Sequence, residues 1–142
     1  MIYLLFFLLT NAPTYVHASS VNCTPEEQIK AEEASDTVHD WDSLYRAYSQ
    51  FGNCDDGGTA EGFSDTVMEL FAKKWETTPR LFVLISRDKG FEGFILNHID
   101  ATGDPDDIEK LRRNAQYHCP AQRNKICKLI ILRAKIAIEN MN

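Results

Sequence analysis

The sequence predicts an all-α protein, a compact array of about six or seven short helices in antiparallel hairpins, stapled by two disulfides. Apolar residues recur at helical spacing in nearly every segment, and no segment alternates apolar and polar residues as a half-buried strand does. Helix-start signals precede most of these segments. The chain has four cysteines, an even number that suits two disulfide bonds.

The first eighteen residues are predicted to be a signal peptide. They contain no Asp, Glu, Lys or Arg, and the apolar run Ile2–Leu9 is too short to span a bilayer. Val16 and Ala18 supply the small residues that a signal peptidase prefers. We therefore expect residues 1–18 to be removed and 19–142 to form a single helical domain, periplasmic or secreted. The alternative is a buried first helix, which the lack of any polar face disfavours.

Capping signals place the first three helices. Thr24-Pro25-Glu26-Glu27 is a capping box with proline at the first helical position, which predicts a helix over 25–35. Asp40 is the expected N-cap of a second helix that ends at Gly52. A loop over 53–58 leads to a third helix with an apolar stripe at Ala60, Phe63, Val67, Leu70, Phe71 and Trp75.

The second half of the chain shows the same signals. Thr78 and Pro79 open a fourth helix, and Asp88 caps a fifth that extends to Ile99. Pro105 opens a sixth helix, and the last helix runs through Ile126 to about residue 138. Short turns between such helices favour antiparallel neighbours. The sequence shows no repeat of fixed period, so a solenoid is not predicted.

The helix layout suggests how the cysteines pair. A hairpin of the first two helices brings Cys23 next to Cys54. Cys119 and Cys127 would lie about 12 Å apart along one helix, so they can pair only if 120–124 is a turn, with Asn124 as N-cap of the last helix. In the alternative, residue 120 opens the helix and Cys119 pairs elsewhere. Disulfides indicate an oxidising compartment, and the cysteine spacing does not suit zinc, so no metal is expected.

The charge balance restricts the possible partners. A net charge of −6 and a pI near 5.1 disfavour nucleic acid, and disfavour an anionic membrane surface once the signal peptide is removed. A basic protein partner fits better. The candidate binding residues are Asp55, Asp56 and Glu61, in a segment rich in acidic residues and glycine. In the alternative interpretation, Asp55 and Asp56 only complement a helix N-terminus.

Catalytic motifs are weak. The sequence has no zinc-protease helix motif and no Gly-x-Ser-x-Gly elbow, and nothing in it indicates a cofactor. The enzymatic alternative is a small cell-wall hydrolase that uses Glu61 and Asp65 for acid/base chemistry. A carrier of apolar ligands would need a cavity among the aromatic residues of the second helix.

Four segments carry a resemblance: Asp40-Trp41-Asp42-Ser43-Leu44-Tyr45, Cys54-Asp55-Asp56-Gly57, Ala60-Glu61-Gly62-Phe63-Ser64 and His98-Ile99-Asp100-Ala101-Thr102. Together they resemble small exported bacterial proteins of unknown function, which implies a bacterial periplasmic or secreted setting and transfers no site. The architecture is also loosely similar to helical immunity proteins that neutralise secreted cell-wall-degrading toxins. The sequence thus favours an exported, non-enzymatic binding protein, immunity- or inhibitor-type, that meets a basic protein through acidic loops.

Overall fold

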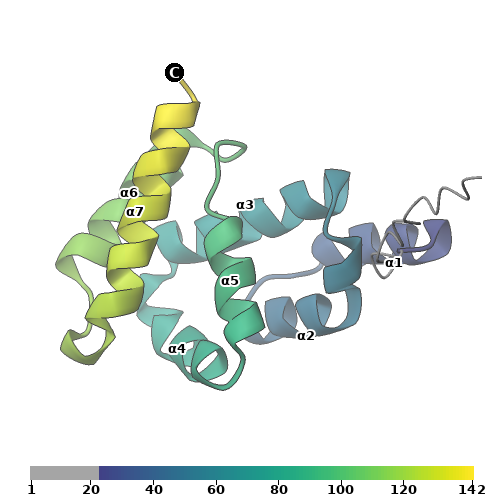
Figure 1. Cartoon of the computed structure of the whole chain (residues 1–142), viewed down its shortest axis with the longest axis horizontal. Helices are drawn as coiled ribbons and strands as arrows, with labels where there is room; N and C mark the ends of the chain where they lie inside the picture. The colour runs from purple at the N-terminus through teal and green to yellow at the C-terminus, as the bar shows by residue number, and fades with distance from the viewer. Residues whose placement is uncertain (1–22) are drawn as a thin grey trace, which may run out of the picture.

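The computed structural model describes residues 23–142, and the predicted signal peptide lies outside this range. This part of the chain forms seven α-helices, linked in places by short 3₁₀ turns, and contains no strand (Figure 1). The helices are α1 (Pro25–Ser35), α2 (Trp41–Phe51), α3 (Gly57–Lys73), α4 (Thr78–Arg87), α5 (Lys89–Asn97), α6 (Pro105–Tyr117) and α7 (Asn124–Asn140). The predicted all-α class and helix number are confirmed. No helix of the described part is long and apolar enough to cross a membrane.

Most predicted helix starts are confirmed by their capping contacts. The Thr24 side chain accepts a hydrogen bond from the backbone N–H of Glu27, whose carboxylate accepts one from the Thr24 N–H at 2.8 Å. Asp40, Asp88 and Asp104 each accept backbone N–H bonds at the starts of α2, α5 and α6. These contacts satisfy donors that have no partner within the helix.

Four boundary predictions were wrong, each for a local reason. The expected loop over 53–58 is shorter, because Asp56 caps α3 and Gly57 enters it with φ +53°. Trp75 lies beyond α3, since the Thr77 hydroxyl donates to the Lys74 carbonyl and competes with the helix. The fifth helix ends before Ile99, which is nevertheless buried. The fourth concerns Asn124, which is the first residue of α7 and not its side-chain cap.

Both predicted disulfides are present. Cys23 pairs with Cys54 at a Cα separation of 5.0 Å, and Cys119 pairs with Cys127 at 6.2 Å. The second pair is possible because a 3₁₀ turn, Ala121–Arg123, breaks the chain between α6 and α7. The local pairing is therefore confirmed, and the alternative partner for Cys119 is not used.

Helix α3 connects the two ends of the molecule. It packs against α1 at one end and against α6 at the other, while α6 and α7 form an antiparallel hairpin (Figure 1). Its buried side includes Phe63, Val67 and Phe71, all fully inaccessible to solvent. The opposite side of α3 is free to carry polar groups, and the candidate site lies there.

The aromatic stripe of α2 belongs to the core. Trp41 is 1 % exposed, and its ring lies 5.0 Å from that of Phe71. The rings of Tyr45 and Tyr48 lie 4.9 and 5.1 Å from that of Phe91 in α5. These rings fill the space in which an apolar ligand would have to bind.

Candidate acidic site

A row of carboxylates runs along the exposed side of α3. Glu61, Asp65 and Glu69 are spaced four residues apart, so successive side chains lie above one another on the same helix face. All three residues are exposed. Like charges at this spacing destabilise a helix by about 0.2–0.5 kcal/mol per pair. Repulsion within this row of carboxylates therefore destabilises α3.

Asp65 lies at the centre of this negative charge. Partial burial raises the pKa of its carboxyl group, and the carboxylates of Glu61, Asp100 and Glu69 raise it further. Lys73, one turn beyond Glu69, bonds to Asp107 at 3.0 Å. All the charged groups that shift the pKa of Asp65 are thus carboxylates.

A chain of hydrogen bonds lies beside this row and partly beneath the surface. The Nε2 atom of His98 lies 3.0 Å from Oδ2 of Asp55, and its Nδ1 atom lies 2.9 Å from Oγ of Ser64. The Ser64 hydroxyl in turn donates to Oδ2 of Asp100 at 2.8 Å. His98 and Ser64 are buried, whereas 27 % of the Asp55 side chain remains exposed. Two buried polar groups therefore join two carboxylates that reach the surface.

Asp100 is held on both of its oxygens. Burial acts to raise the pKa of Asp100, but hydrogen bonds from Thr102 and Ser64 and the nearby His98 lower it below its ordinary value. The Thr102 N–H and hydroxyl donate to Oδ1 at 2.8 and 2.5 Å. Asp100 is consequently an ionised, oriented carboxylate. We call Asp55, Glu61, Asp65, Glu69 and Asp100 the acidic face.

The structure separates the three predicted binding residues. Asp55 and Glu61 belong to the acidic face, whereas Asp56 caps α3 through a 2.8 Å bond from the N–H of Gly57. The capping interpretation therefore holds for Asp56, but Asp55 contacts His98 instead of the helix end.

Four members of the site were not predicted as binding residues. The sequence analysis gave no binding role to Glu69, His98 or Asp100, and Ser64 lies between Phe63 and Val67 on the buried side of α3. A serine on an apolar helix side needs a hydrogen-bond partner, and this was the one available signal. Its partner is 34 residues away along the chain, so the sequence does not identify it.

The contacts of Ser64, His98 and Asp55 have the order of a catalytic triad but not its function. A nucleophilic serine must reach substrate and give its proton to the histidine. Ser64 is 1 % exposed, and its hydroxyl proton is directed to Asp100. This arrangement holds side chains in place and does not present a nucleophile.

Cys23, Glu27 and Cys54 also lie close together, with one potential ligand atom of each within 4.8 Å of the others. The two sulfur atoms are bonded to one another, so neither is a thiolate that could bind a metal ion. This group is therefore explained by the disulfide.

Comparisons of the chain with protein-family models, curated proteins and solved structures give no match. The functional argument rests on the acidic face itself.

Replacing Asp65 by asparagine should stabilise the protein at neutral pH. A carboxyl group with a raised pKa in the folded state favours folding only while it is protonated, and this contribution is lost as pH rises through the folded-state pKa. Removing the charge relieves two like-charge pairs, a gain of about 0.4–1 kcal/mol. Urea unfolding measures this gain in the free energy of unfolding, which should shrink under acidic conditions. A loss of stability at neutral pH would contradict the repulsion argument.

Proposed function

We propose that this protein is an exported binding protein, immunity- or inhibitor-type, whose acidic face meets a basic protein partner in the periplasm or outside the cell. One observation carries the proposal: Asp65 is surrounded by carboxylates along an exposed helix, at a cost to stability. Functional surfaces commonly retain groups that destabilise the free protein. A row of lysine or arginine side chains on a partner would turn this repulsion into attraction.

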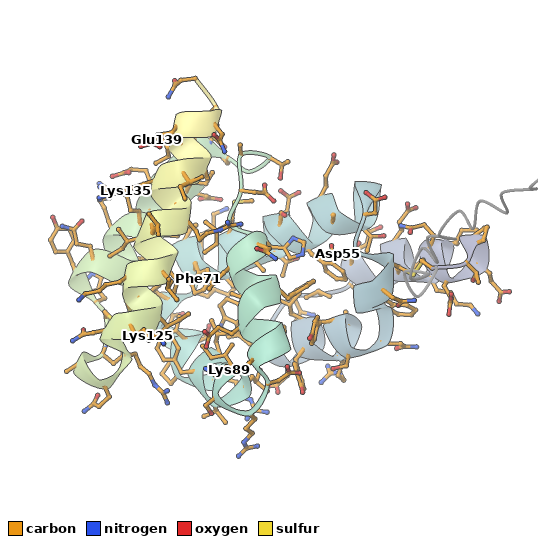
Figure 2. The ribbon with its side chains drawn as sticks, in the orientation of Figure 1. Asp55, Phe71, Lys89, Lys125, Lys135 and Glu139 are labelled. Carbon is orange, nitrogen blue, oxygen red and sulfur yellow. A yellow bond between two sulfur atoms is a disulfide. The ribbon has the colours of Figure 1, made fainter. Side chains whose placement is uncertain are left out.

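Charge is also segregated along the molecule. Residues 23–72 contain twelve Asp and Glu against two Lys and Arg, a net charge of −10, whereas residues 110–142 contain one acidic and eight basic residues, a net of +7. Figure 2 shows Asp55 toward the end that contains α1 and α2, and Lys125 and Lys135 on α7 at the other end. Such a charge dipole orients a basic partner toward the acidic face before contact.

Export is supported by two features. The uncharged, apolar segment over 1–18 suits a signal peptide. The two disulfides are typical of an oxidising compartment.

A cell-wall hydrolase is the weaker alternative. A raised carboxyl pKa, as at Asp65, is what such enzymes give a general acid. A glycosidase, however, needs its two carboxyl groups on either side of the scissile bond. Glu61, Asp65 and Glu69 follow a single helix face and approach a ligand from the same side.

The test is capture of a partner from extracts of exported proteins by three forms of the chain. The wild type is compared with the triple variant Glu61→Gln, Asp65→Asn and Glu69→Gln. The control is Glu76→Gln, Asp106→Asn and Glu139→Gln, which removes the same charge from exposed positions elsewhere.

We expect the wild type and the control to retain the same basic partner. The acidic-face variant should associate with it about tenfold more slowly at low salt, a difference that shrinks at high salt. Equal association rates for the two triple variants would refute the proposal, because only net charge would then matter.

A further inference from the structure

Hydrogen bonds link Asp55, His98, Ser64 and Asp100 beneath the acidic face. They determine the charge of the buried His98 ring. We propose that His98 is a buried imidazolium, protonated on both nitrogens, and that it positions the two carboxylates of the acidic face that flank it. The coupling to partner binding rests on the proposed function, whereas the protonation state does not.

The number of hydrogens available to these four side chains decides the protonation state of His98. This series of hydrogen bonds contains three contacts: Asp55 with His98, His98 with Ser64, and Ser64 with Asp100. Each contact needs one hydrogen, and Ser64 supplies one. A neutral imidazole supplies one more, so one contact would hold two facing lone pairs. An imidazolium supplies two and completes all three.

A carboxyl group does not supply the third hydrogen. Both oxygens of Asp100 accept hydrogen bonds, and the pKa of this group is lowered. In a contact between a carboxyl group and an imidazole, the imidazole is the stronger base and keeps the proton. The third hydrogen is therefore assigned to His98.

The surroundings of the ring support a positive charge. His98 is the C-cap of α5, where the helix dipole favours a cation. The centroid of the Phe94 ring lies 4.3 Å from that of the imidazole, close enough for a cation–π contribution. Burial, which leaves His98 4 % exposed, acts in the opposite direction.

Three further charged groups lie on the elements around α5. Arg133 of α7 donates to the Leu96 carbonyl at 2.7 Å and opposes a second cation at this helix end. Asp65 of α3 adds negative charge through its proximity to Asp100. Asp88, bonded to Tyr45 of α2, lies at the opposite end of α5, next to α4. Two carboxylates within the hydrogen-bonded chain outweigh the single guanidinium.

The positive charge of His98 offsets part of the negative charge of the acidic face. A neutral side chain at this position would remove one hydrogen bond of the series and the positive charge beneath Asp55 and Asp100. Attraction for a basic ligand should then increase by a few-fold.

Nitrogen-15 NMR of the histidine side chains in the full chain tests the protonation state. At about pH 7 we expect the two His98 nitrogens to have similar shifts, the signature of an imidazolium. Asp55→Asn keeps an acceptor oxygen but removes the charge, and it should convert His98 to a neutral ring with well-separated shifts. Asp56→Asn is the matched control and should leave the ring charged. A neutral His98 in the wild type at this pH overturns the inference.

A second measurement tests the coupling, with a short poly-lysine peptide as the probe. At a fixed pH, His98→Gln, which removes the positive charge beneath the acidic face, should bind the probe a few-fold more tightly than the wild type. Equal affinities for the two forms would overturn the coupling. Absence of poly-lysine binding at any pH would instead refute the proposed function, and the NMR result would still decide the charge of His98.

Discussion

Replacing Phe71 by alanine should lower the free energy of unfolding by about 3–5 kcal/mol. Phe71 is fully buried on α3, and its ring lies 5.0 Å from that of Trp41 and 5.8 Å from that of Trp75. It thus joins α2 to the segment that leads into α4, near the middle of the molecule (Figure 2). Removing the ring leaves a cavity between two rigid indoles, which cannot close it by small rotations.

The measurement is the midpoint of urea unfolding, with the slope of the transition held as a check on two-state behaviour. Tyr117→Ala is the control, because it removes an aromatic ring that is 69 % exposed, and it should change stability by no more than about 0.5 kcal/mol. Similar losses for the two variants would show that Phe71 does not support the core as described.

The helices could be predicted because their signals are local. Thr24, Asp40, Asp88 and Asp104 act within one helical turn, so their capping roles are visible in the sequence. The Cys119–Cys127 disulfide followed from the same local reasoning, since only a turn can bring the two residues together. Errors occurred where a competing local contact was not considered, as for Thr77 at the end of α3.

The candidate site was predicted only in part, because it joins distant segments. Asp55 and Glu61 drew attention as acidic residues close together in the sequence. The contact between Asp55 and His98 spans 43 residues, and that between Ser64 and Asp100 spans 36. Such contacts depend on how α3 and α5 pack, and a single sequence does not specify that packing. The charge of His98 follows only once these distances are known.

Removing the Cys23–Cys54 disulfide with Cys23→Ala and Cys54→Ala should cost about 3.7 kcal/mol, and the same change at Cys119 and Cys127 about 2.6 kcal/mol. The difference arises because the first bridge closes a separation of 31 residues and the second one of 8. The longer closed loop restricts the unfolded chain more strongly. Urea unfolding of both double variants under non-reducing conditions measures the two losses.

Loss of either disulfide should also weaken hydrogen-exchange protection in a different part of the molecule. Helix α1 buries only Ala31 and Ser35, so few apolar contacts hold it once Cys23 is released. We expect its backbone amides to exchange rapidly with solvent in the Cys23→Ala, Cys54→Ala variant, while α6 and α7 stay protected. Loss of the other bridge should leave α1 protected, because α6 and α7 still pack along their lengths. Unchanged protection of α1 without its bridge would mean that packing alone, through Ala31 and the Gln28–Thr59 hydrogen bond, secures this helix.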